Sequence, residues 1–171
     1  MLIVENMLFG ISIGLLILRL FFGLTVSAHG AQKLFGWFGG SGLDGFGKMM
    51  ERLNVRPAWP FALLAGLGEF GGGLLVALGF LNPAGPLVIA GAMLVAILTV
   101  HVTKGFFNTN GGYEFPLLIL GGALALSIMG PGAYSLDGVL RLSLPEPEAW
   151  IVFGLLSVGG AIAALASRRV G

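Results

Sequence analysis

Two charged residues lie inside apolar segments, where a charge is costly. Arg19 lies within the apolar run 7–27, and Glu69 lies midway through a second run, 60–81. An arginine at the centre of a membrane helix costs roughly 2.5–3.5 kcal/mol on insertion scales, so it is usually retained for a partner or a polar cavity. We predict that Arg19 and Glu69 form a direct or water-bridged pair. Such a pair either fixes helix packing only or forms the charged floor of a ligand pocket.

Further polar residues gather where several apolar segments end on the same side. His29 and Lys33 are four residues apart and therefore share a helix face, and the step from Arg19 to Lys33 is close to four whole turns. The predicted topology brings the ends of two other segments to the same level. We therefore predict one cavity, with the two intramembrane charges at mid-depth. Its lining residues are Arg19, Glu69, His29, Lys33, His101, Lys104, Tyr113 and Glu114.

Each of these residues also has an ordinary structural interpretation. Lys33 and Lys104 stand at helix ends, where lysines commonly extend their ammonium groups to the interface. Tyr113 fits the aromatic belt of a membrane protein. His29 and His101 are uncommon residue types within membrane spans, but each could make a satisfied interhelical hydrogen bond. The sequence is compatible with two interpretations: a ligand site, and a bundle in which these residues only pack against one another.

The composition excludes several other chemistries. The chain has no cysteine, which excludes disulfides, Cys-ligated iron–sulfur clusters and thiol nucleophiles. Two histidines on two helices could ligate a b-type haem, but nothing else marks a porphyrin pocket, so haem is not expected. Clustered carboxylates are missing, so no metal site is predicted. A net charge of +1 gives no reason to expect nucleic-acid binding.

These residues must be positioned by membrane helices. The chain of 171 residues is 56% hydrophobic and 10% charged, whereas soluble domains have about 25% charged residues. The 30 glycines lie mostly within or at the ends of apolar runs, where small residues let helices approach closely. A span needs about 20 residues. We predict an all-α membrane protein with five spans, at 7–28, 60–81, 84–103, 115–131 and 149–167.

Two connections between the predicted spans are longer than a turn. The first contains a short amphipathic helix, at about 43–54, in which Leu43, Phe46, Met50 and Leu53 can share one face. We expect this helix to lie in the headgroup layer of the lipid bilayer. The second connection, 132–148, is an outer linker to the last helix.

Three motifs follow one another along the chain. They are Arg19 followed by His29-Gly30-Ala31-Gln32-Lys33-Leu34-Phe35-Gly36, then Gly68-Glu69-Phe70-Gly71-Gly72, then His101 with Gly105-Phe106-Phe107 and Gly111-Gly112-Tyr113-Glu114. Their order is similar to that of the DoxX family of small bacterial and archaeal membrane proteins. The resemblance covers about residues 12–131 and implies a four-helix membrane core over 1–131. The segment 149–171, a fifth helix with a basic tail, departs from that core.

The family resemblance implies a redox setting for the chain. The family takes its name from a subunit associated with a terminal quinol oxidase, and relatives resemble the membrane subunit of thiosulfate:quinone oxidoreductase. Other relatives look like membrane partners of redox-stress proteins or like assembly factors. The resemblance therefore implies a quinone-linked redox subunit or accessory protein in a membrane complex, and it assigns no catalytic residue.

The residues themselves suggest how a quinone would bind. Its head would enter near the inner interface and accept a hydrogen bond from His29 or His101. Glu69 would relay a proton while Arg19 holds it ionised, because quinol oxidation releases protons as well as electrons. The electrons would leave through a partner protein. The alternatives are a non-catalytic scaffold or assembly factor and, third, a small-solute transporter, for which the inverted repeat is missing. Whether the chain is an enzyme stays open.

Basic residues predict the orientation in the cytoplasmic membrane. With five spans, seven basic residues share one side and only Arg141 lies on the other, apart from Arg19 within the membrane. The positive-inside rule then puts the N-terminus outside and the C-terminus in the cytoplasm. A topology reporter fused after Gly171 should give a cytoplasmic signal, and an external signal would contradict the predicted orientation. The seven residues are Lys33, Lys48, Arg52, Arg56, Lys104, Arg168 and Arg169.

Overall fold

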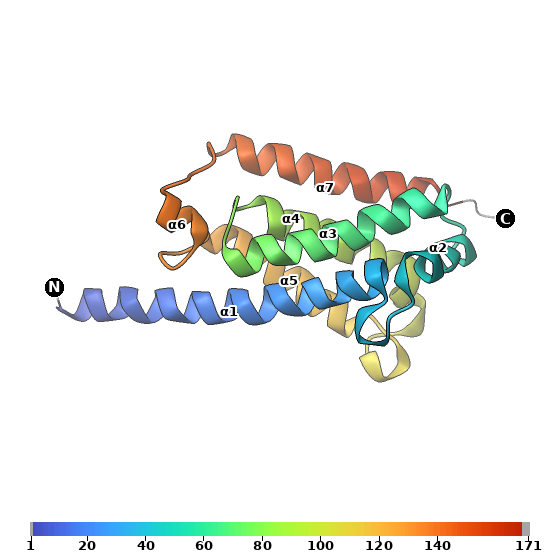
Figure 1. Cartoon of the computed structure of the whole chain (residues 1–171), viewed down its shortest axis with the longest axis horizontal. Helices are drawn as coiled ribbons and strands as arrows, with labels where there is room; N and C mark the ends of the chain where they lie inside the picture. The colour runs from blue at the N-terminus through green and yellow to red at the C-terminus, as the bar shows by residue number, and fades with distance from the viewer. Residues whose placement is uncertain (1, 169–171) are drawn as a thin grey trace.

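Every regular element within residues 2–168, the part of the chain that the computed structural model describes, is helical. Side chains are described from Val4 onward, and Arg169 of the basic tail lies outside the described residues. Figure 1 shows long helices arranged as a bundle. The longer helices are α1 (Leu2–Phe35), α2 (Gly42–Arg52), α3 (Ala58–Leu78), α4 (Ala84–Ala96), α5 (Glu114–Met129) and α7 (Glu148–Ala166). The short elements are α6 (Leu136–Leu140), η1 (Trp37–Gly39), η2 (Ile97–His101), η3 (Val102–Lys104) and η4 (Asn108–Asn110).

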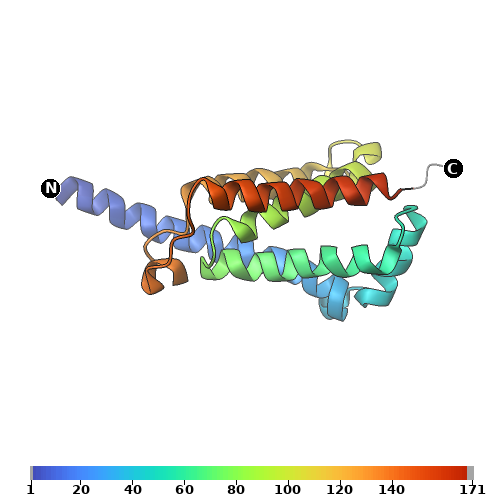
Figure 2. The ribbon, with the colours of Figure 1, turned by 90° about the horizontal axis from the view of Figure 1, so that it is seen from above.

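Helices α1, α3, α4 and α5 form the core of the bundle, and α7 packs on α4 (Figures 1 and 2). Their shared apolar core includes Val26 of α1, Val76 of α3, Ile89 of α4 and Ala123 of α5. Ser157 of α7 donates a hydrogen bond to the carbonyl of Leu87 on α4. The predicted all-α bundle is therefore confirmed, with the last helix attached to the outside of the core.

Four helical segments of the described chain are long and apolar enough to cross a membrane: Val4–Phe35, Ala58–Leu78, Ala84–Lys104 and Glu148–Ala166. Helix α5 has 16 residues, which is about 24 Å against a hydrocarbon thickness of about 30 Å. The predicted segment 115–131 ends early because Gly130, at φ 77°, and the following Pro131 cannot continue the helix. The fourth predicted span is thus a helix of the bundle, but a short one.

Helix α1 is longer than the predicted span 7–28. It has 34 residues, about 51 Å, and its N-terminal part extends beyond the rest of the bundle (Figures 1 and 2). At the other end it continues through His29 and Lys33 and stops at Gly36, which adopts the left-handed conformation with φ 72°. His29 and Lys33 therefore both lie within α1.

The amphipathic helix is present as α2, and its apolar face is covered by protein. Phe46 and Met50 are buried against Val55, Ala58 and Ala62 at the start of α3. This packing arises because the chain turns directly from α2 into α3 and brings the two apolar surfaces together. That α2 lies in the headgroup layer stays a prediction. The charged side chains of Lys48, Glu51 and Arg52 are exposed.

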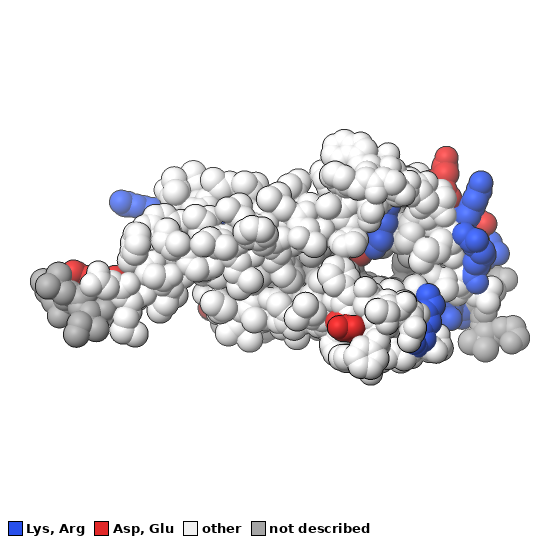
Figure 3. Space-filling view, turned by 90° about the horizontal axis from the view of Figure 1, so that it is seen from below, with Lys and Arg blue, Asp and Glu red and all other residues white. Residues whose placement is uncertain are grey.

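The C-terminal end of α7 lies beside the connection between α2 and α3. Val55 and Arg168 form an isolated antiparallel β-bridge, and Arg168 Nε donates to the carbonyl of Leu53 at 3.2 Å. The tail and the first connection therefore share one end of the molecule, as an odd number of crossings requires. Figure 3 shows most lysine and arginine side chains gathered at this end. We call it the basic end; its described basic residues are Lys33, Lys48, Arg52, Arg56, Lys104 and Arg168.

Small residues bring α1 and α3 into close contact. A Cβ atom added at Gly23 would lie 2.5 Å from the backbone nitrogen of Ala77, and one added at Gly30 would overlap the backbone of Phe70. Between them, Ser27 Oγ donates to the Phe70 carbonyl at 3.0 Å. Close backbone approach and an interhelical hydrogen bond are the interactions that hold helices together in lipid.

We predict that Gly30→Val destabilises the bundle by about 1–3 kcal/mol, because the added side chain has no space at the α3 backbone. Thermal unfolding of the purified protein in detergent would measure the loss. Gly14→Val on the same helix is the control, since nothing lies within 4 Å of a Cβ added there. Equal losses in the two variants would contradict the close α1–α3 contact.

Candidate functional site

An ion pair between α1 and α3 is the centre of the candidate site. Lys33 Nζ donates to Glu69 Oε1. The Glu69 side chain is 2% exposed and that of Lys33 is 25% exposed. The antiparallel packing produces this pairing, since Gly30 lies against Phe70 and Leu34 against Gly66, which places Lys33 beside Glu69.

The predicted pair between Arg19 and Glu69 is wrong. Arg19 precedes Lys33 by fourteen residues, about 21 Å along the helix. Because α3 runs antiparallel to α1, Arg19 lies beside Gly79 at the C-terminal end of α3 instead. Its Nη2 donates to the carbonyl of Tyr134. The sequence correctly indicated that each of the two charges has a partner. It paired them with each other, whereas Glu69 pairs with Lys33 and Arg19 bonds a backbone carbonyl.

The ion pair leaves one strong acceptor free. Glu69 Oε2 is buried and has no hydrogen-bond partner among the described residues. On the other side, the ammonium of Lys33 lies 5.1 Å from the ring centroid of Phe46 on α2, a distance at which an aromatic face attracts a cation. Lys33 is therefore positioned by a carboxylate and a ring, while one oxygen of that carboxylate remains able to accept a hydrogen.

His29 stands one helical turn before Lys33 and faces α5. Its ring centroid is 5.4 Å from that of Phe115, with an angle of 58° between the planes. The side chain is half-buried. His29 and Lys33 thus occupy neighbouring positions on the part of α1 that is packed between α3 and α5. Figure 3 shows a hollow in the molecular surface near the basic end, with a basic and an acidic group at its rim.

His101 closes a π-helical segment, Ile97–His101, at the end of α4. Its Nδ1 is 2.6 Å from the carbonyl oxygen of Gly111. Because a carbonyl only accepts, Nδ1 carries the hydrogen in this contact and Nε2 is left for another partner. π-Helical segments within α-helices occur frequently at functional sites. His101 also ties the end of α4 to the following loop.

The remaining predicted residues organise that loop. The Tyr113 ring packs edge-on against Phe106, with centroids 5.5 Å apart. Glu114 Oε2 accepts a hydrogen bond from the backbone nitrogen of Asn108 at 2.8 Å. Lys104 is exposed. These contacts favour a structural role for Tyr113 and Glu114, and they keep the ends of α4 and α5 together.

The structure thus brings together only part of the predicted set. Glu69 and Lys33 are in contact, and His29 is adjacent on α1. Arg19 belongs to a different region of the bundle. That His29, Glu69 and His101 border one cavity stays a prediction. Within residues 4–168, no three His, Asp or Glu side chains are grouped so that they could hold a metal ion.

Sequence reasoning missed two side chains. Phe46 was assigned only to the apolar face of an amphipathic helix, and its contact with Lys33 has no local sequence signal. Asp137 is 4% exposed, and its two oxygens accept from the backbone nitrogens of Leu81 and Asn82, both at 3.0 Å. It lies in the linker, outside the apolar runs. The sequence feature that could have pointed to Asp137 is Ser135. Ser135 caps the short helix α6, which contains Asp137, by accepting a hydrogen bond from the backbone nitrogen of Gly138.

We predict strong energetic coupling between Lys33 and Glu69. Lys33→Met alone should cost about 3–5 kcal/mol, because it leaves the buried Glu69 carboxylate without its partner. Glu69→Gln should cost less, because Lys33 is 25% exposed, and the double variant should cost less than the sum of the two. Unfolding of the four proteins of this cycle in detergent would measure the coupling. Glu51 and Arg56, exposed and 4.0 Å apart, are the control pair and should couple by less than about 1 kcal/mol. Additive losses at Lys33 and Glu69 would refute the coupling.

Two comparisons with known proteins identify a family. The DoxX family model matches residues 14–102, which is about half of the chain. The chain is also similar to "Inner membrane protein YqjF" of Escherichia coli (strain K12), with 33% identity over 129 residues, covering 75% of this chain and 93% of YqjF. No solved structure matches. With its apolar helices, this similarity supports a multi-pass location in the cytoplasmic membrane. The chain belongs to the DoxX family.

Proposed function

We propose that this protein is a quinone-linked subunit or accessory protein of a membrane oxidoreductase complex. The proposed ligand site is formed by Lys33, Glu69 and His29. The observation that carries the proposal is Oε2 of Glu69, a buried acceptor that lies next to a lysine and has no hydrogen-bond partner in the part of the chain that the structure describes. Perturbed or unsatisfied ionisable groups inside a membrane bundle commonly mark a ligand or proton pathway.

The three side chains are suited to a quinol and its oxidised form. The hydroxyl of a quinol would donate to Glu69 Oε2, and the carbonyl of a quinone would accept from Lys33 or His29. Oxidation of the quinol releases two protons and two electrons. Glu69 would accept the proton of the hydroxyl that it binds, the second hydroxyl would release its proton to water at the basic end, and both electrons would pass to the redox centre of a partner protein. Lys33, rather than Arg19, is the cation that contacts the Glu69 carboxylate in this site.

The position of the pair favours exchange with water at the basic end. Lys33 is the more exposed member of the pair and lies three residues before the glycine that ends α1. A proton accepted by Glu69 therefore has a short route to solvent. By the charge distribution, this end would face the cytoplasm.

A scaffold or assembly protein is the second candidate function. It is favoured by the internal contacts of His101, Tyr113 and Glu114, which need no ligand to explain them. In that case the Lys33–Glu69 pair only fixes the contact between α1 and α3.

Quinone binding by the purified protein in lipid nanodiscs tests the proposal. Titration with a short-chain ubiquinone and with its quinol should give saturable binding. Glu69→Gln should weaken quinol binding by about tenfold, because one hydrogen bond to a charged acceptor contributes about 1.5 kcal/mol or more. His29→Gln keeps the size of the side chain and should weaken binding without a large loss of thermal stability.

Glu51→Gln is the matched control. Glu51 also pairs with a basic residue, Arg56, but its side chain is 54% exposed. Its variant should bind quinol like the unchanged protein. Equal binding by the Glu69, His29 and Glu51 variants would refute the ligand site and leave the scaffold function.

A further inference from the structure

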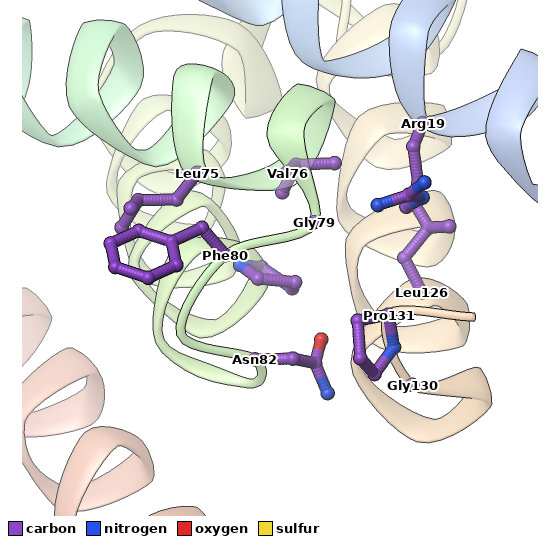
Figure 4. A pocket seen from close by; sticks show the side chains of 10 residues that line it. Arg19, Leu75, Val76, Gly79, Phe80, Asn82, Leu126, Gly130 and Pro131 are labelled. Carbon is purple, nitrogen blue, oxygen red and sulfur yellow. The ribbon is translucent and has the colours of Figure 1, made fainter. Parts of the chain in front are cut away.

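A second polar centre surrounds Arg19, away from the Lys33–Glu69 pair. Figure 4 shows the Arg19 side chain reaching from α1 into the space between Val76 and Gly79 on one side and Leu126 and Pro131 on the other. The cavity there has a volume of about 10 Å³. Arg19 is 3% exposed. The cavity is therefore lined by a fully buried cation and otherwise mostly by apolar groups.

Hydrogen bonding of this guanidinium is incomplete within the protein. Nη2 donates to the carbonyl of Tyr134. Nε and Nη1 are buried and have no acceptor among the described residues. A buried donor without an acceptor costs about 1–3 kcal/mol, and more when the group is charged. Two of the three guanidinium nitrogens thus lack an acceptor in the described part of the chain.

Acidic and partially negative groups already lie near the guanidinium. Asp137 is buried and interacts electrostatically with Arg19. The cavity is also lined by Gly79 and Gly130, the residues that follow the C-terminal ends of α3 and α5. Each helix end carries the equivalent of about half a negative charge. A bound anion would add charge of the same sign as these groups, so a neutral acceptor fits the site better.

The cavity volume limits this acceptor to a very small molecule. A volume of about 10–15 Å³ holds one water, provided that the water finds two or more polar partners. Arg19 offers two N–H-bearing nitrogens without an acceptor among the described residues. The C-terminal end of α5, where Leu126 and Gly130 line the cavity, would supply the other partner, because the last carbonyl groups of a helix have no partner within it. The head of a quinone is far larger than the cavity, so this site is separate from the proposed ligand site.

We propose that the cavity holds a single internal water, which accepts a hydrogen bond from Nε or Nη1 of Arg19 and donates to backbone carbonyl groups at the C-terminal end of α5. The water completes a polar cluster that joins α1, the turn between α3 and α4, and the linker after α5. Tyr134 and Asp137 supply the linker's part of the cluster. This end of the bundle is thereby fixed by hydrogen bonds in place of a buried ion pair.

An experimental structure of the full chain, at a resolution that shows ordered solvent, tests the proposal directly. One solvent peak within 3.5 Å of Arg19 Nε or Nη1 is expected. In solution, the protein labelled with ¹⁵N-arginine should show a magnetisation-transfer peak between the Arg19 Nε–H and a long-lived water. A cavity without a solvent peak would overturn the proposal. So would a halide there, identified by the anomalous signal of bromide.

Variants that fill the cavity give a second test. Val76→Ile adds one methyl group to its wall and should abolish the water peak while the bundle still folds. Gly79→Ala should have the same effect with a larger loss of stability, because a Cβ at Gly79 would overlap Arg19 Nη1 and strain the φ of 62°. Gly36→Ala is the control for strain alone: it has a φ of 72°, and its Cβ would meet its nearest atom at 3.4 Å. It should keep the water signal. A signal that persists in Val76→Ile would contradict the proposed position of the water.

Discussion

The close antiparallel contact between α1 and α3 determines where Arg19, Lys33 and Glu69 lie relative to one another. Gly23, Gly30 and Gly73 let the two backbones approach, and Ser27 fixes their relative position by its bond to the Phe70 carbonyl. In lipid, such packing and hydrogen bonding replace the hydrophobic driving force that holds helices together in water. Once this register is set, Lys33 must lie beside Glu69, and Arg19 must lie at the C-terminal end of α3.

Lys33 and Arg19 are stabilised in different ways as a result. Lys33 has a carboxylate and an aromatic ring, so its charge is paired locally. Arg19 has a backbone carbonyl, the carboxylate of Asp137 and the ends of two helices, so its charge is spread over several groups. A side chain with five donors suits the second environment, because a planar guanidinium can bond several carbonyl groups that a lysine would not reach together.

The sequence predicted the helices better than it predicted their contacts. Hydrophobic run length located all five apolar helices, but it ended the first at 28 and the fourth at 131, whereas α1 continues to Phe35 and α5 stops at Met129. The error at Arg19 has a physical cause. Arg19 and Glu69 were paired because both lie inside apolar runs, but which residues of two helices face each other depends on the helix register. That register is set by glycines whose contacts lie on the other helix. Phe46 and Asp137 were missed for the same reason, since each acts on a residue distant in the sequence. Burial of Glu69, by contrast, followed from its position in an apolar run.

The two charged centres differ in their access to water and therefore in the chemistry that each can support. A group that takes up and releases protons must exchange them with solvent, and Lys33, at 25% exposure, gives Glu69 a neighbour that reaches the surface. Arg19 is 3% exposed, and an arginine stays protonated in proteins. Its cluster therefore serves to hold helix ends together. The free oxygen of Glu69 combines burial, a negative charge and a nearby surface, which is the combination that a proton-coupled ligand site requires.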